Sequence, residues 1–338
     1  MKRFHFDVVV FDLDGTLVAT ERTWPDAGRA ASLRFLAEPG ATRFDIPSAD
    51  GWLEMIGLPL PKAFAASFPE LDEGARARLI ELCEEEQNKL LGRGRAQVLP
   101  GVEQALDALR ADGVQMGVAS NCGRDYLGAM MDGLGLDSWI SEARCLATPG
   151  VRNKADMIED LLLSFGTRSA VVVGDRQSDR DAAWNNGLPF VHVPRGYGLE
   201  GSVRAEAMLD GVDQLPELLQ RRTEALDAIL ARAAGAPIEV TGRPKSGVSL
   251  LERDLASRAA DVSGDRPVGG TGGDPLSVHC VADQEVLLRR ARGLRIGPAP
   301  IEDLAQRLRS AESPRSGDLV VDLSNVIVPT LGGVPAGA

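Results

Sequence analysis

The chain has 338 residues, of which 44% are hydrophobic and 25% are charged, which is enough for two or three domains with hydrophobic cores. Its formal net charge of −12 argues against a general nucleic-acid or anionic-membrane surface, because binding to a phosphate backbone depends on clustered lysine and arginine. No apolar run approaches the roughly 18 residues that a membrane span requires.

The first predicted element is a buried strand through Val8, Val9 and Val10 that ends in Asp12 and Asp14. Side chains of a strand repeat every second residue, so both carboxylates are expected on the same side. Two like charges held so close call for a cation, a proton or a catalytic role. The strand breaks at Gly15, which puts the pair at its carboxyl end, where open α/β sheets place their active sites.

Residues 18–98 contain helical patterns and no convincing strand. The clearest helix is predicted over 72–91, where apolar residues recur at helical spacing and the acidic run 84–86 falls on the solvated face. We therefore expect a helical insertion after the first strand.

From residue 100 onwards, helices and strands alternate. Strands are predicted at 114–119, 139–146, 170–173 and 190–193, and helices lead up to 112 and cover 123–134, 153–165 and 179–186. This βαβ alternation predicts an α/β fold with a doubly wound parallel sheet and helices on both faces.

Polar residues stand at three further places along this edge of the predicted sheet. Ser120 and Asn121 follow one strand, and a hydroxyl with backbone N–H groups at such a turn suits phosphate oxygens. Lys154 opens a helix and can meet a phosphoryl group as a point charge. Asp175 and Asp179 follow the strand 170–173 and add two carboxylates. Oxygen ligands of this kind favour Mg²⁺. Asp179 also fits the alternative of a helix cap.

These motifs, in this order and spacing, resemble those of the haloacid dehalogenase superfamily of phosphohydrolases, over roughly residues 5–222. The resemblance implies a Rossmann-like core in which Asp12 is the nucleophile that forms an aspartyl phosphate. Asp14 would be the general acid and base. Ser120, with Asn121, and Lys154 would bind phosphate, while Asp12, Asp175, Asp179 and the backbone carbonyl of Asp14 would hold Mg²⁺.

The helical insertion resembles the cap of phosphoglycolate-phosphatase-like and β-phosphoglucomutase-like members, which closes over a small substrate. The stretch Gly196-Tyr197-Gly198 is similar to one in the phosphoglycolate-phosphatase-like branch. Thr16 stands where mutase members usually carry another residue, so hydrolysis is favoured over isomerisation. Arg176, where the family more often has a small residue, is expected either to touch substrate or to point to solvent.

A second unit is predicted from residue 235, giving domains at 1–234, with the cap at about 18–98, and at 235–338. Gly242, Lys245, Gly247 and Ser249 lie in a strand, loop and helix order similar to a phosphate-binding loop, with Val248 where that motif has its lysine. Lys245 could substitute from inside the loop. The segment resembles a degenerate P-loop kinase-like domain, either vestigial or a nucleotide site.

The function predicted is a Mg²⁺-dependent phosphatase acting on a small phosphomonoester, such as a sugar phosphate or a phosphoglycolate-like acid. One alternative is a bifunctional phosphatase and kinase that processes polynucleotide or metabolite ends, which the acidic composition and Val248 oppose. Another is a non-catalytic regulator that binds a phosphorylated metabolite. The four cysteines show no CxxC spacing and residues 1–12 no cleavable leader, so a cytoplasmic protein is expected.

Overall fold

The computed structural model describes residues 2–194, 203 and 205–233, and the strands 238–242, 276–281, 319–322 and 330–332. The chain divides into two compact units. One contains residues 8–203 and 208–213, and the other contains residues 1–7, 204–207 and 214–338. The domain boundary expected between residues 234 and 235 stays a prediction. No helix of the described residues is long and apolar enough to cross a membrane.

A six-stranded sheet with the order β3-β2-β1-β4-β5-β6 forms the centre of the fold, and β1 to β5 pair in parallel. The strands are β1 (Val8–Phe11), β2 (Gln115–Ser120), β3 (Glu142–Cys145), β4 (Ala170–Gly174), β5 (Phe190–His192) and β6 (Ala207–Met208). All four residues of β1 are buried, as a valine-rich strand with both faces covered requires. The predicted parallel α/β sheet is confirmed.

Four helices alternate with these strands: α5 (Val102–Ala111), α6 (Arg124–Gly133), α7 (Lys154–Phe165) and α8 (Gln177–Asn185). In α5, for example, Val102, Leu106 and Leu109 form a buried apolar side. At the start of α7, the side chain of Asn153 accepts a hydrogen bond from the Asp156 N–H, which fixes where that helix begins.

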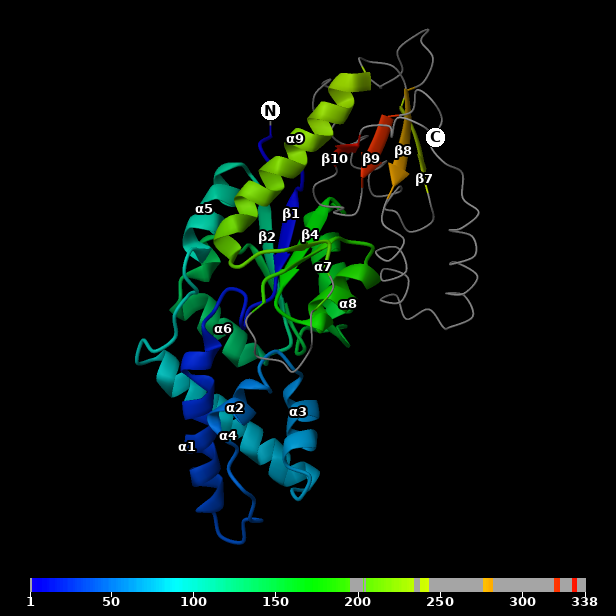
Figure 1. Ribbon diagram of the computed structural model, residues 1–338. Coiled ribbons are helices and arrows are strands. Elements are labelled where there is room, and N and C mark those ends of the chain that lie inside the picture. The colour runs from blue at the N-terminus through cyan, green and yellow to red at the C-terminus, as the bar shows by residue number, and fades with distance from the viewer. Residues whose placement is uncertain are drawn as a thin grey trace, which may run out of the picture. The chain divides into compact units, whose positions relative to one another are not determined.

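Four further helices, α1 (Trp24–Leu36), α2 (Ala49–Leu53), α3 (Leu60–Ser67) and α4 (Glu73–Leu91), form a helical cap. They gather at one end of the core (Figure 1). The chain leaves and returns side by side, because Val18 and Val98 form an antiparallel bridge. The cap has a core of its own, in which Trp52 packs edge-on against Trp24 and Phe64. Aromatic packing of this kind stabilises so small a bundle.

In the other unit, α9 (Leu215–Ala233) lies on the N-terminal segment, where the Arg222 guanidinium stacks over the Phe6 ring at 4.7 Å. A second sheet has the order β10-β9-β8-β7, in which β7 (Ile238–Gly242), β8 (Leu276–Val281) and β9 (Leu319–Asp322) are parallel and β10 (Thr330–Gly332) is antiparallel. Gly242 is the last residue of β7. Lys245, Gly247, Ser249 and the stretch 196–198 lie outside the described residues.

Candidate active site

Three neighbouring strands of the core sheet bring polar residues to one edge. β1 lies between β2 and β4, so their carboxyl ends are adjacent. Asp12 directly follows β1, and its N–H donates to the Val173 carbonyl of β4 at 2.9 Å. Ser120 is the last residue of β2 and Asp175 directly follows β4. Parallel pairing in this register is therefore what gathers residues more than 100 positions apart in the chain.

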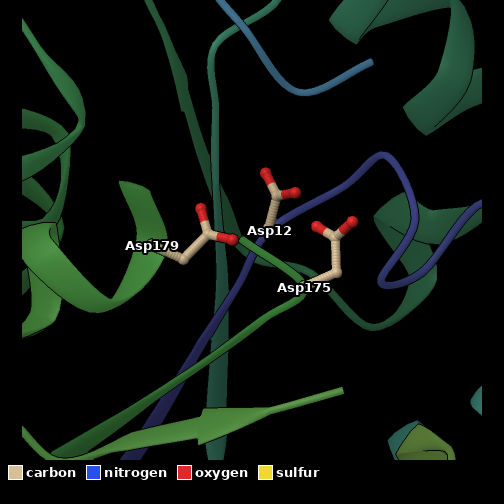
Figure 2. A group of neighbouring side chains, drawn as sticks. All are labelled: Asp12, Asp175 and Asp179. Atoms are coloured by element: carbon tan, nitrogen blue, oxygen red, sulfur yellow. The ribbon is translucent and has the colours of Figure 1, made fainter. Parts of the chain in front are cut away.

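Asp12, Asp175 and Asp179 offer carboxylate oxygens that lie within 4.8 Å of one another, and all three side chains are buried. Figure 2 shows them side by side, with Asp12 and Asp175 on the segments after two strands and Asp179 on α8. A cluster of three carboxylates at this spacing is suited to share one cation.

Lys154, the first residue of α7, contributes the ammonium group of the site. Its Nζ lies 2.6 Å from Asp12 Oδ1 and 2.6 Å from Asp179 Oδ1, with the lysine only 5% exposed. Burial alone would lower the pKa of Lys154, but the charges of Asp12 and Asp179 outweigh it and the pKa rises above its ordinary value. The lysine is therefore a fixed positive charge beside Asp12.

Asp179 has a second role as a local structural residue. Its Oδ2 accepts a hydrogen bond from the Arg176 N–H at 2.9 Å, at the start of α8. The helix-cap geometry and the approach to Lys154 thus use different oxygens of one carboxylate.

Burial dominates the electrostatics of the other two carboxylates. It raises the pKa of Asp12 to about 7, although Lys154 acts in the opposite direction. Burial, followed by the charges of Asp12 and Asp179, raises the pKa of Asp175 well above its ordinary value. Asp12 and Asp175 therefore hold their protons more tightly than exposed aspartates do.

The cluster fits a hard divalent cation. Asp175 Oδ1 is buried and has no hydrogen-bond partner among the described residues, which is costly for a polar atom unless a ligand satisfies it. The donors are oxygens without nitrogen or sulfur, the set that Mg²⁺ prefers. The carboxylate of Asp14 is outside this group of three.

Asp14 is held instead by two hydroxyl groups. Thr20 Oγ1 and Tyr126 OH both donate to Asp14 Oδ1, each at 2.6 Å. Burial raises the pKa of Asp14, and these two hydrogen bonds partly offset the rise. Neither Thr20 nor Tyr126 is among the site residues predicted from the sequence; the one signal for each is a hydroxyl residue that follows shortly after a motif.

Ser120 and Asn121 lie beside a cavity between the core and the cap. The cavity measures about 510 Å³, including space open to solvent, and Asp14, Ser120, Asn121 and Cys122 line it from the core. The cap contributes Trp24, Met55, Ile56, Gly57, Leu58, Leu60 and Glu84. The Asn121 side-chain amide donates to the Gly57 carbonyl of the cap at 3.0 Å. Burial, followed by the charge of Asp14, raises the pKa of Cys122 well above its ordinary value, so it is a neutral thiol.

Comparison with known proteins gives a consistent result. A family model described as haloacid dehalogenase-like hydrolase matches residues 9–193. The chain is 32% identical over 223 residues to a phosphoglycolate phosphatase of Rhodospirillum rubrum, covering 62% of this chain and 90% of that protein. It is 29% identical over 225 residues to a phosphoglycolate phosphatase (plasmid) of Cupriavidus necator, covering 62% and 92%.

A solved structure of similar fold is that of a predicted phosphoglycolate phosphatase from Haemophilus somnus. The TM-score is 0.54 and the sequence identity 21%, and the match covers 63% of this chain and 98% of that one. At this level of identity the likeness concerns the fold alone.

Proposed function

Because this chain belongs to the haloacid dehalogenase-like hydrolase family and is a phosphoric monoester hydrolase, we propose that it is a Mg²⁺-dependent phosphatase that works through an aspartyl phosphate on Asp12. Its substrate class in this proposal is a small phosphomonoester, such as a sugar phosphate or a phosphoglycolate-like acid. We also propose that the protein is located in the cytoplasm.

The proposed reaction has two steps. An oxygen of Asp12 attacks phosphorus, and the bond from phosphorus to the ester oxygen breaks while Asp14 gives its proton to the leaving oxygen. Asp14 then takes a proton from the water that attacks the aspartyl phosphate, which returns Asp12 and inorganic phosphate. Ser120, with Asn121, and Lys154 hold the phosphate oxygens in place. Mg²⁺, which Asp12, Asp175, Asp179 and the Asp14 carbonyl would hold, would supply positive charge that offsets the charge of the phosphoryl oxygens.

One observation carries the proposal: Asp12 and Asp14, which are two residues apart, have different surroundings. Asp12 accepts a hydrogen bond from the ammonium group of Lys154 at 2.6 Å, whereas Asp14 accepts hydrogen bonds from the hydroxyls of Thr20 and Tyr126. A nucleophile needs a fixed cation beside it, and a proton carrier needs neutral donors that leave its charge free to change.

The test is the variant Asp12→Asn, which keeps the size of the side chain and removes the nucleophilic charge. We expect phosphatase activity on p-nitrophenyl phosphate to fall about a thousandfold or more while the variant still folds and unfolds cooperatively on heating. Asp107→Asn, which removes an exposed carboxylate of α5, is the matched control and should keep full activity. EDTA should abolish wild-type turnover and added Mg²⁺ restore it. Full activity of Asp12→Asn, or turnover without metal, would overturn the proposal.

We also propose that residues 235–338 form a degenerate P-loop kinase-like domain. The parallel pairing of β7, β8 and β9 supports an α/β unit there. Val248 stands where the phosphate-binding motif has lysine, so we expect no ATP binding. Calorimetric titration of the full-length protein with ATP and Mg²⁺ should give no heat of binding; saturable heat that is lost in Lys245→Ala would instead establish a nucleotide site.

A further inference from the structure

The wall of the cavity that faces the candidate phosphate site has an unusual charge distribution. Among the described residues that line it, the charged side chains are Asp14 and Glu84, both acidic, and none is lysine or arginine. The rest of the cap side is apolar, with Met55, Ile56 and Leu58 among its residues. A wall of this composition suits the carbon skeleton of an alcohol and offers no positively charged partner to a second anionic group.

Glu84 extends from α4 of the cap to the loop that carries Ser120. Its Oε1 lies 2.9 Å from the position that a Cβ atom on Gly123 would occupy, so this carboxylate touches the backbone just three residues beyond the serine. Its surroundings are also negative: burial, followed by the charges of Asp125 and Glu81, raises the pKa of Glu84. The loop that carries Ser120 therefore lies close to a carboxylate of the cap.

Lys154 and Arg176 are buried cations near the site, but neither lines the cavity. Lys154 Nζ contacts Asp12 and Asp179 on the core side. Arg176 Nη2 donates to the Glu54 carbonyl at 3.4 Å, and its side chain packs on Gly57 without lining the cavity. Neither contributes a positive charge to the lining of the cavity.

We infer that the alcohol released by this phosphatase carries no negative charge, and that Glu84 is a specificity-determining residue that discriminates against carboxylate-bearing phosphomonoesters. This inference rests on the proposed function and narrows its substrate class to esters of uncharged alcohols. A carboxylate in the leaving group would meet Glu84 without a compensating cation, and like-charge repulsion in a partly buried pocket costs about a factor of ten in affinity or more.

A matched pair of small esters tests the inference directly. Phosphoglycolate and 2-hydroxyethyl phosphate differ in a carboxylate against a hydroxymethyl group and are otherwise alike. We expect kcat/KM of the wild-type enzyme with Mg²⁺ to be about tenfold or more higher for 2-hydroxyethyl phosphate. The ratio of these two kcat/KM values in the wild-type enzyme tests the inference without any variant.

The variant Glu84→Gln tests the contribution of the Glu84 charge to this preference. We expect it to raise kcat/KM for phosphoglycolate relative to 2-hydroxyethyl phosphate, so that the ratio falls at least about fivefold. Glu85→Gln is the matched control, because Glu85 is on the same helix, carries the same charge and pairs with Arg34 on the exposed side. Its ratio should stay within about twofold of that of the wild type.

The outcomes separate the two proposals. A wild-type preference for phosphoglycolate, or a ratio that Glu84→Gln leaves unchanged, would overturn this inference while leaving the phosphatase intact. If the wild-type enzyme hydrolyses neither ester and also fails on p-nitrophenyl phosphate, the proposed function itself is wrong, and this inference is lost with it.

Discussion

Asp14 is oriented by donors that act on one of its two oxygens. Thr20 and Tyr126 both donate to Oδ1, so Oδ2 is the atom left for exchanging a proton with the substrate or with water. Burial, followed by the charge of Asp14, raises the pKa of Tyr126 well above its ordinary value, so its phenol remains a donor. This arrangement separates the task of holding the carboxyl group from the task of moving its proton.

Tyr126→Phe removes one of these donors and keeps the ring. A hydrogen bond to a charged group is worth about 1.5–3 kcal/mol, and a carboxylate that loses orientation loses rate more than binding. We therefore expect kcat to fall about tenfold while KM stays within about twofold, measured with a small phosphomonoester at saturating Mg²⁺.

Thr20→Val is the companion variant, since it removes the other donor to the same oxygen. Its effect on kcat should be similar, and the double variant should lose more than the product of the single losses, because the second removal leaves a buried carboxylate without a donor. Wild-type kcat in both single variants would contradict a positioning role.

At the scale of helices and strands, the residues at strand ends were predictable and the contacts between segments were not. Asp12, Ser120 and Asp175 follow from hydrophobic runs that stop at polar residues, because parallel strands end at one edge. Periodicity contains no information on which loop faces which helix. Arg176 illustrates the limit: of its two predicted positions, the one facing solvent is wrong, because the side chain is 4% exposed and packs on Gly57 of the cap.

Gly57 joins the cap to the core in a way that only the folded chain reveals. It has φ +76°, accepts the Asn121 amide at its carbonyl and leaves no room for a Cβ, which would lie 2.8 Å from the Arg176 side chain. The left-handed conformation and the close approach both require glycine. Asn121 and Arg176 come from the same edge of the sheet as the catalytic candidates, so the cap is fixed where the chemistry is proposed.

In helix α4, too, the hydrophobic pattern predicts the buried stripe but not the polar contacts. The predicted stripe is buried at Leu79, Leu82 and Cys83, but Gln87 is buried as well, because its amide donates to Thr23 Oγ1 at 3.1 Å. A pattern based on hydrophobicity assigns glutamine to the surface and cannot anticipate that partner. The acidic run 84–86 was expected to be solvated; Glu85 is exposed and pairs with Arg34 there, but Glu84 lines the cavity.

At the scale of the whole molecule, the buried carboxylates lower the free energy of unfolding by an amount that depends on pH and on bound metal. The ordinary pKa of an aspartate is 3.8, and burial raises that of Asp12 to about 7. The folded state therefore holds this proton more tightly than the unfolded state, so the stabilising contribution is complete below about pH 4 and is lost as the pH rises through about 7. Asp175, whose pKa is raised by burial and by Asp12, acts in the same direction.

Thermal unfolding between about pH 5 and pH 8, with and without Mg²⁺, tests this linkage in the full-length protein. Mg²⁺ binds ionised carboxylates of the folded state, so it should raise the melting temperature by ~5 °C near pH 8 and by almost nothing near pH 5. Asp175→Asn removes one of the mutually repelling buried charges, so near pH 8 the metal-free variant should melt above the metal-free wild type, and Mg²⁺ should stabilise it less. Asp107→Asn should behave as the wild type. A Mg²⁺ effect that is the same at both pH values, or a metal-free Asp175→Asn variant that melts below the wild type, would mean that the buried carboxylates do not set the stability of this fold.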